Sequence, residues 1–222
     1  MKRIKKILLN NKYLSWLLIV SNWAFQGIIN ADLTEKIFKI FFTFFFWALL
    51  FLGFWNTLPL MQNIILSFLI AHTFNWLFNG SIVTLFIHRL LIMKVSKEKL
   101  FAYLISFQNR IQNKKWVLYS ASFGSICRGK LKDSSDIDVS IVRKSGFVNG
   151  IKAIFFTIKE KKIADFKGIP LEIYISDTPQ NSINRFKKEN NPVVVTDSIN
   201  TIDIYYNEKL TISEAKKLNK VL

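Results

Sequence analysis

Hydrophobic positions run almost without interruption through residues 37–78, whereas in the C-terminal half they alternate with polar positions. Residues 37–55, IFKIFFTFFFWALLFLGFW, form one apolar run, and residues 58–78 form a second run of similar length. A helix of about 20 apolar residues crosses the hydrocarbon core of a bilayer. Asn56 and Pro59 lie between the runs and favour a tight turn. The pattern predicts a hairpin of two spanning helices. A buried soluble helical core is the alternative, but the first run has no polar face.

The apolar stretches on either side of this hairpin allow two interpretations. Residues 13–29 place Ser15, Asn22 and Gln26 on one helical face, which fits an interfacial amphipathic helix or a spanning helix with a polar stripe. Residues 81–93 are short for a span. Both ends of the apolar region are basic, so the positive-inside tendency places both in the cytoplasm. We therefore expect two spans or four. A cleavable signal peptide does not fit, because the apolar content extends far beyond one short segment.

Three polar residues in the second apolar run lie at helical spacing. His72, Asn75 and Asn79 share one face of the predicted helix. Polar residues inside a membrane often belong to functional sites, but they also form hydrogen bonds between helices. We expect these three side chains to hold the helices together.

The C-terminal half has the periodicity of short strands mixed with helices. In residues 136–142, DIDVSIV, the alternation places Asp136 and Asp138 opposite the apolar side chains; in residues 171–176, LEIYIS, it does the same for Glu172. Thr211 and Glu214 have the spacing of a helix-capping pair. Together these patterns predict an α+β fold with a small mixed sheet. The predicted strands are residues 116–122, 136–142, 171–176 and 192–197, and the predicted helices are residues 147–162 and 211–221.

Composition places the domain boundary close to residue 95. Residues 37–97 contain no acidic residue, whereas the chain from Lys94 onward carries 23 basic and 13 acidic residues. We expect a membrane-embedded helical region in residues 1–95 and a separate α+β domain in residues 96–222. The chain from Lys94 onward has a net charge of +10, which suits a nucleotide, a polyanion or an anionic membrane face. Nucleic acid fits less well, because no aromatic residues interleave with the lysines.

The single cysteine, Cys127, excludes an intramolecular disulfide, and a small buried filler is its expected role.

The acidic strand positions are candidates for metal binding. Asp136 and Asp138 are neighbours on one face and repel each other, so they need a cation or strong donors to stay ionised. If the two acidic strands are adjacent, Glu172 joins them on the same surface. Three carboxylates on a rigid sheet can hold Mg²⁺ together with phosphates. Two such ions can stabilise the attacking and leaving oxygens of a phosphoryl displacement.

A longer motif surrounds these aspartates and resembles a known family. It consists of a Gly-Ser turn, an Arg-Gly pair and a Ser-Asp-Ile-Asp sequence, at Gly124-Ser125, Arg128-Gly129 and Ser135-Asp136-Ile137-Asp138. The order and spacing resemble the nucleotidyltransferase superfamily with the DNA polymerase β-like fold, and most of all its minimal nucleotidyltransferases. The resemblance extends over about residues 115–206.

The resemblance implies a role for each matching residue. Gly124 and Ser125 would bind the triphosphate of a nucleotide, and Arg128 would contact a phosphate or brace the loop. Asp136 and Asp138 would ligate the metal ions. Glu172 would be the third catalytic carboxylate, in place of the aspartate that is commoner in the family.

The whole sequence thus predicts a multi-pass protein of the cytoplasmic membrane with a nucleotidyltransferase domain that faces the cytoplasm. The expected partners are a nucleoside triphosphate, Mg²⁺, membrane lipids and a hydroxyl acceptor, with pyrophosphate as the leaving group. The location favours a lipid-linked or membrane-protein acceptor. Two alternatives remain: a non-catalytic module that binds a nucleotide or a partner protein, as antitoxin-type relatives do, and a membrane scaffold with a soluble appendage.

Overall fold

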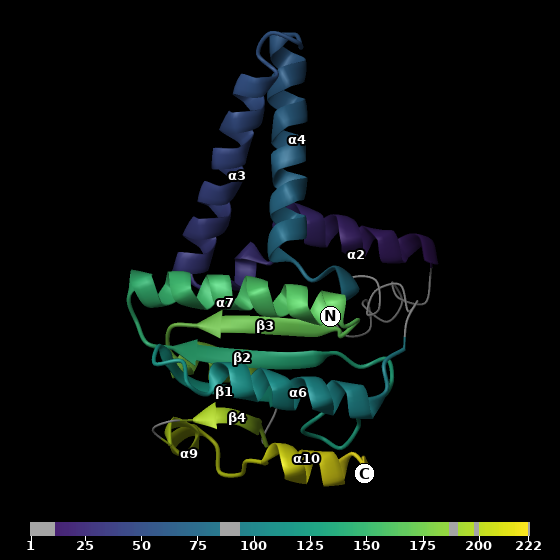
Figure 1. Cartoon of the computed structure of the whole chain (residues 1–222), viewed down its shortest axis with the longest axis vertical. Coiled ribbons are helices and arrows are strands. Elements are labelled where there is room, and N and C mark those ends of the chain that lie inside the picture. The colour runs from purple at the N-terminus through teal and green to yellow at the C-terminus, as the bar shows by residue number, and fades with distance from the viewer. Residues whose placement is uncertain (1–11, 85–93, 187–190, 198–199, 222) are drawn as a thin grey trace.

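A helical hairpin stands on a compact α+β layer in the computed structural model (Figure 1). The structure describes residues 12–84, 94–186, 191–197 and 200–221. The basic N-terminal segment and most of the apolar stretch at residues 81–93 lie outside these ranges, so the predictions that fall on them concern residues that are not described.

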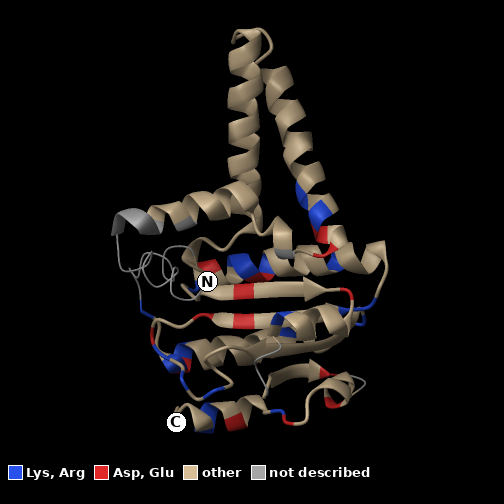
Figure 2. Ribbon diagram, turned by 180° about the vertical axis from the view of Figure 1, so that it is seen from behind, with Lys and Arg blue, Asp and Glu red and all other residues tan. Residues whose placement is uncertain are grey.

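The hairpin consists of α3 (Leu33–Gly53) and α4 (Leu60–Asn79). Asp32 begins α3 by accepting a hydrogen bond from the Glu35 amide at 2.8 Å, which satisfies one of the unpaired amides at a helix start. Both helices are long and apolar enough to cross a membrane, as predicted from the two runs. Charged residues of the hairpin are confined to the base of α3 (Figure 2).

Polarity in the hairpin is inverted relative to a soluble helix pair. Asn63, Ser67 and Asn75 are buried between the helices, whereas apolar side chains such as Phe41 and Leu52 are about two-thirds exposed, at 66% and 67%. The Asn75 side-chain amide donates to the Lys39 carbonyl at 3.0 Å and to the Thr43 hydroxyl at 2.6 Å. Hydrogen bonds inside and hydrocarbon outside suit a lipid environment.

Helix α2 (Lys12–Phe25) lies across the lower end of α4 (Figure 1). Trp23 donates to the Thr73 hydroxyl at 3.0 Å, and Asn22 accepts from the Trp76 indole at 2.8 Å, so the polar face of α2 meets α4. Trp16 faces outward. The direction of α2, across the hairpin and not along it (Figure 1), fits the interfacial helix of the two interpretations of this stretch.

The predicted interhelical role is confirmed for His72 and Asn75, whereas the side chain of Asn79 bonds within α4 itself. A ring nitrogen of His72 lies 2.9 Å from the Trp23 carbonyl, Asn75 bonds to α3, and Asn79 donates to the Asn75 side chain. The short turn η1 (Ile28–Asn30) then connects α2 to α3.

The α+β layer is built on a four-stranded mixed sheet, as predicted. Its order is β3-β2-β1-β4; β1 is antiparallel to β2 and β4, and β2 is parallel to β3. The residues of β3 agree with the prediction, and the other strands begin one residue later. The strands are β1 (Val117–Phe123), β2 (Ile137–Arg143), β3 (Leu171–Ser176) and β4 (Val193–Asp197).

Helices cover the two faces of the sheet unequally. The larger core lies on one face, where Ile137, Val139 and Ile141 of β2 pack with side chains of the long helices. The opposite face has a small cluster around Tyr119 and Phe123, and it is the face on which Asp138 lies. The helices of the larger core are α6 (Lys97–Ile111), α7 (Phe147–Phe166) and α10 (Ile212–Leu218); the smaller face is covered in part by α8 (Pro179–Phe186) and α9 (Thr201–Tyr205).

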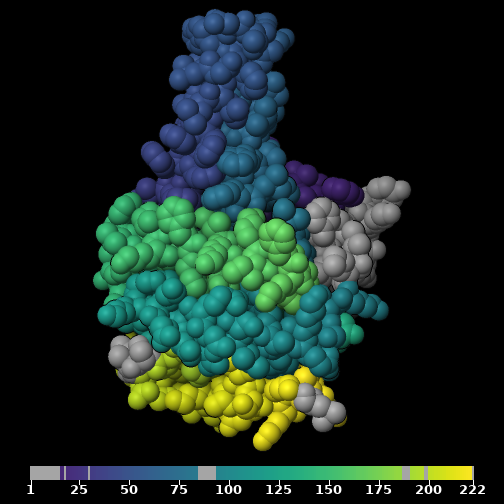
Figure 3. All heavy atoms as spheres, in the orientation of Figure 1, coloured from purple at the N-terminus to yellow at the C-terminus, as the bar shows by residue number. Residues whose placement is uncertain are grey.

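The hairpin is docked on α7 (Figure 3), and the residues at the start of α3 also contact Arg143 at the end of β2. The buried Arg143 guanidinium lies 3.0 Å from Asp32 and donates to the Thr34 hydroxyl at 3.1 Å. Gly150 of α7 lets the helices approach closely, because a Cβ there would lie 2.5 Å from the Thr34 methyl carbon. The hairpin and the α+β layer are therefore packed against each other through buried contacts.

Candidate metal and phosphate site

Three carboxylates lie close together on the sheet face that carries the small cluster around Tyr119 and Phe123. Parallel pairing of β2 with β3 places Asp138 directly opposite Glu172, and Asp136 immediately precedes β2. One ligand oxygen from each of the three lies within 4.8 Å of the others. Figure 2 shows the acidic positions of the two strands side by side. The predicted convergence of Glu172 with the two aspartates is thus present, and these half-buried carboxylates could hold a metal ion.

The backbone at Gly124 passes unusually close to this carboxylate group. Gly124 follows β1 with a φ of +85°, and a Cβ at this position would lie 2.8 Å from Asp138 Oδ2. L-residues rarely adopt this backbone conformation, and here the space is closed as well. Any other residue would be strained at this φ and would displace the Asp138 carboxylate.

Ser125 places a polar atom without a partner beside the same turn. Its hydroxyl oxygen is buried and forms no hydrogen bond with any residue that the structure describes. A buried hydroxyl normally finds a partner, so an unpaired one marks either a local energetic cost or the position of a ligand. Its place next to Gly124 agrees with a turn that receives an anion.

The C-terminal helix braces the loop that follows. The Asn219 side chain accepts from the Leu131 amide at 3.0 Å and donates to the Ile126 carbonyl at 2.7 Å. Arg128 is exposed on this loop, and Cys127 is buried within it, as expected for a filler. Nothing in the local sequence around the motif indicates Asn219, because the contact joins residues about ninety positions apart.

Tyr174 hydrogen-bonds to the Glu172 carboxylate. Burial raises the pKa of the Tyr174 phenol, and the negative charges of Glu172 and Asp138 raise it further. The hydroxyl therefore remains a hydrogen-bond donor that can orient Glu172. The alternation of β3 places Tyr174 on the same face as Glu172, so the sequence contained this signal although we did not single it out.

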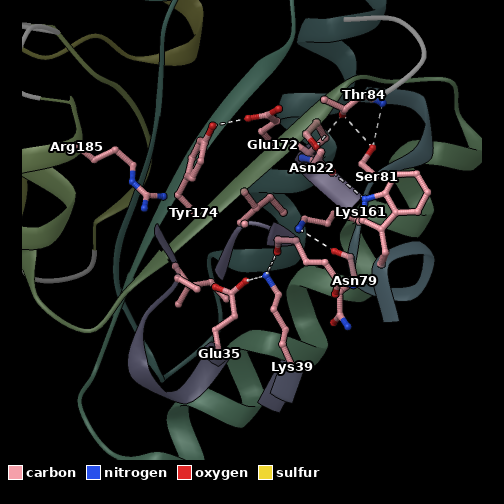
Figure 4. A pocket seen from close by; sticks show the side chains of 18 residues that line it. Asn22, Glu35, Lys39, Asn79, Ser81, Thr84, Lys161, Glu172, Tyr174 and Arg185 are labelled. Atoms are coloured by element: carbon pink, nitrogen blue, oxygen red, sulfur yellow. Dashed lines mark hydrogen bonds and ion pairs between the residues drawn. The ribbon is translucent and has the colours of Figure 1, made fainter. Parts of the chain in front are cut away.

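A cavity of about 270 Å³ adjoins Glu172 on the side of the hairpin. Figure 4 shows Lys161 of α7 between Glu172 and the Glu35–Lys39 pair of α3. The Lys161 ammonium donates to the Asn79 carbonyl at 3.0 Å, and burial, with a smaller effect of Lys39, lowers its pKa to about 8. In the sequence Lys161 belongs to a basic stretch that resembles a solvated helix end.

The arrangement combines a hard oxygen ligand set with a tight, donor-bearing turn. Carboxylate oxygens are ligands that Mg²⁺ prefers, so the residues present fit that ion. Ser125 and the amides of the Gly124 turn could meet the phosphate oxygens that such an ion brings with it. Comparison of the chain with protein-family models, with curated proteins and with solved structures finds no match.

Proposed function

We propose that the chain is a Mg²⁺-dependent nucleotidyltransferase of the polymerase β-like superfamily that acts at a membrane surface. The observation that supports this most directly is the convergence of Asp136, Asp138 and Glu172 within 4.8 Å, next to the Gly124 turn. Carboxylates alone would fit many metal sites. The Gly-Ser turn against Asp138 is what makes a bound triphosphate the best fit.

Each residue of the site has a role in this proposal. Asp136, Asp138 and Glu172 hold Mg²⁺, which supplies neutralisation of phosphate charge when it is bound. The Ser125 hydroxyl donates to a phosphate oxygen, which gives the buried atom its missing partner. Arg128, exposed on the same loop, approaches the phosphates from the solvent side.

The reaction is attack by an acceptor hydroxyl on the α-phosphorus of a nucleoside triphosphate. The new bond joins the acceptor oxygen to the α-phosphorus, and the bond from that phosphorus to the bridging oxygen breaks, so pyrophosphate leaves with the electron pair. The acceptor proton passes to a nearby carboxylate, for which Glu172 is placed. Positioning and electrostatic stabilisation supply most of the rate enhancement in such reactions.

The membrane location is part of the same proposal. Helices α3 and α4 satisfy length and apolarity for two spans, and their buried polar and exposed apolar side chains fit lipid better than water. With two spans, the basic N-terminus and the α+β layer lie on one side of the bilayer. The positive-inside tendency makes that side the cytoplasm.

The test uses the full-length protein in detergent with native membranes, Mg²⁺ and each α-labelled nucleoside triphosphate in turn. We expect labelled product and pyrophosphate release. Asp138→Asn should lower the rate by at least about 100-fold, since even the residues that support metal ligands contribute about 10–100-fold. Asp133→Asn is the matched control, because this exposed aspartate lies in the same loop outside the carboxylate group, and it should retain the wild-type rate.

Two results would count against the proposal. Full activity in both Asp136→Asn and Asp138→Asn would show that the site is elsewhere. Saturable nucleotide binding without any labelled product would support the non-catalytic module instead.

A further inference from the structure

We propose that the cavity between β3 and the base of the hairpin is the acceptor pocket, and that it takes the phosphate-bearing headgroup of an anionic membrane lipid with a free hydroxyl. The inference rests on the proposed function for the transfer step, whereas headgroup binding can be measured separately.

The first argument is the origin of the cavity walls. One wall comes from the base of the hairpin and from α2, including Asn22 and Trp76, and the other comes from β3 and α7. If α3 and α4 span the bilayer with α2 along its surface, this wall lies at the level of the headgroups. A lipid can then reach the cavity without leaving the membrane.

The second argument is the charge inside the cavity. Within the described part of the chain, no carboxylate lies within 4.0 Å of the Lys161 ammonium, which donates a hydrogen bond to the Asn79 carbonyl at 3.0 Å. Lys39, in contrast, is neutralised by Glu35 at 2.6 Å. The charges of Glu35 and Glu172 offset only part of the cost of burying the Lys161 ammonium, and a phosphate in direct contact would offset more of it. Burial is also the main cause of the lowered pKa of Lys161.

The third argument is the position of Glu172. This residue lines the cavity and also belongs to the carboxylate group, so the cavity leads to the proposed metal site. With its phosphate at Lys161, a headgroup can direct a hydroxyl toward Glu172. That hydroxyl oxygen bonds to the α-phosphorus, pyrophosphate leaves with the electron pair, and the proton goes to Glu172. The product is a nucleotide joined to the lipid by a phosphodiester.

The size of the cavity agrees with this occupant. Its volume of about 270 Å³ is slightly below the roughly 300–1,000 Å³ of typical small-molecule sites. A headgroup fits such a space, whereas a complete nucleotide would not be enclosed by it.

Binding is tested without nucleotide, on the full chain in nonionic detergent, with glycerol 3-phosphate as the soluble headgroup probe. Calorimetry should show that Lys161→Met weakens binding at least about tenfold, the effect expected for losing one charged hydrogen bond. Lys159→Met is the matched control: it removes an exposed lysine two residues away on the same helix, outside this cavity, and should change nothing. Equal binding by wild type and Lys161→Met would overturn the proposal.

Thermal stability distinguishes headgroup binding from a purely structural role of Lys161. Because its buried ammonium is unfavourable, Lys161→Met should unfold at the wild-type temperature or above while losing the probe. A lower unfolding temperature together with lost binding would indicate a structural lysine and would contradict the proposal.

Transfer is tested by reconstituting the protein in vesicles of phosphatidylglycerol, phosphatidylserine or phosphatidylcholine with Mg²⁺ and labelled triphosphate. Label should enter lipid only with phosphatidylglycerol, the lipid of the three that combines an anionic headgroup with free hydroxyls. Label in soluble glycerol 3-phosphate but never in lipid would overturn the lipid assignment. If the probe binds in a Lys161-dependent way but no transfer is seen, the headgroup pocket stands and the proposed nucleotidyltransferase activity is refuted. If transfer occurs at the wild-type rate in Lys161→Met, the activity stands and the headgroup pocket is refuted.

Discussion

A methyl group at Gly124 would lie 2.8 Å from Asp138 Oδ2, so the carboxylate or the turn would have to move. We expect Gly124→Ala to push Asp138 or the turn aside, and a misplacement of about 1 Å near reacting groups costs on the order of 100-fold in rate. The measurement is the transfer rate at saturating Mg²⁺. Gly146→Ala is the control, because Gly146 has a φ of +104° but its added Cβ would find no atom closer than 4.0 Å. Similar rate losses in both variants would mean that backbone strain, and not the contact with Asp138, is responsible.

Tyr174 should tune metal affinity through its hydrogen bond to Glu172. Removing the hydroxyl in Tyr174→Phe leaves the ring in place but frees the carboxylate to rotate. We expect Mg²⁺ affinity to fall about 10–100-fold, as is typical when a partner of a ligand is lost. The measurement is the transfer rate as a function of Mg²⁺ concentration. At saturating Mg²⁺ we expect Tyr174→Phe to reach a rate close to that of the wild type. An unchanged Mg²⁺ requirement would show that Tyr174 does not orient Glu172.

The sequence predicted most residues of the carboxylate group, but which residues from other elements lie next to them was harder to predict. Alternation in DIDVSIV and LEIYIS places Asp138 and Glu172 on defined faces, because the side-chain period of a strand is two. That the two strands are parallel neighbours in matching register is a property of the folded sheet. Lys161 was missed for a related reason: a lysine near the end of a basic helix becomes a cavity lysine only when the hairpin packs against α7.

At the scale of elements, the contact between α3 and the end of β2 holds the hairpin on the α+β layer. Asp32 and Arg143 are both about 3% exposed at the side chain, and Asp32 also begins α3. Asp32→Ala should lower the free energy of unfolding by about 3–5 kcal/mol, since it leaves a buried guanidinium without its acid. Chemical denaturation in detergent provides the measurement.

An exposed ion pair is the control for the loss of stability expected from Asp32→Ala. Lys209 and Asp203 pair with side chains about half exposed, at 46% and 48%. Asp203→Ala should cost at most about 1 kcal/mol. If both variants lost the same small amount, the buried pair would not be the main connection between the hairpin and the sheet.

The boundaries of the helices show which sequence signals were reliable. The apolar runs predicted α3 and α4 to within a few residues, because hydrophobic length is a local property. The Thr211–Glu214 pair forms the expected capping box at α10. Whether residues 13–29 cross or lie flat could not be predicted from periodicity, because both arrangements need one polar face. In the structure α2 runs across the lower end of α4 (Figure 1), and its residues Asn22 and Trp23 contact α4.

At the scale of the whole molecule, the polarity of the hairpin suits lipid, whereas the composition of the layer below it suits water. The exposed phenylalanines of α3 would be unfavourable in water, whereas the charged α+β layer needs water around it. The boundary between the two solvents then falls at the base of the hairpin, next to the cavity and Glu172. This placement relates the location of the protein to its proposed acceptor.

The same arrangement predicts the topology of the chain in a membrane. Cys127 is the single cysteine, so a Cys127→Ser background allows one new thiol to be placed at either end of the hairpin. Thr57→Cys lies at the exposed tip, and Lys144→Cys lies on the α+β layer. We expect an impermeant maleimide to label the tip only from outside the cell and the layer only after permeabilisation, because two spans place them on opposite sides. Labelling of both thiols from the same side would show that α3 and α4 do not cross the bilayer, and the lipid acceptor would lose its structural basis.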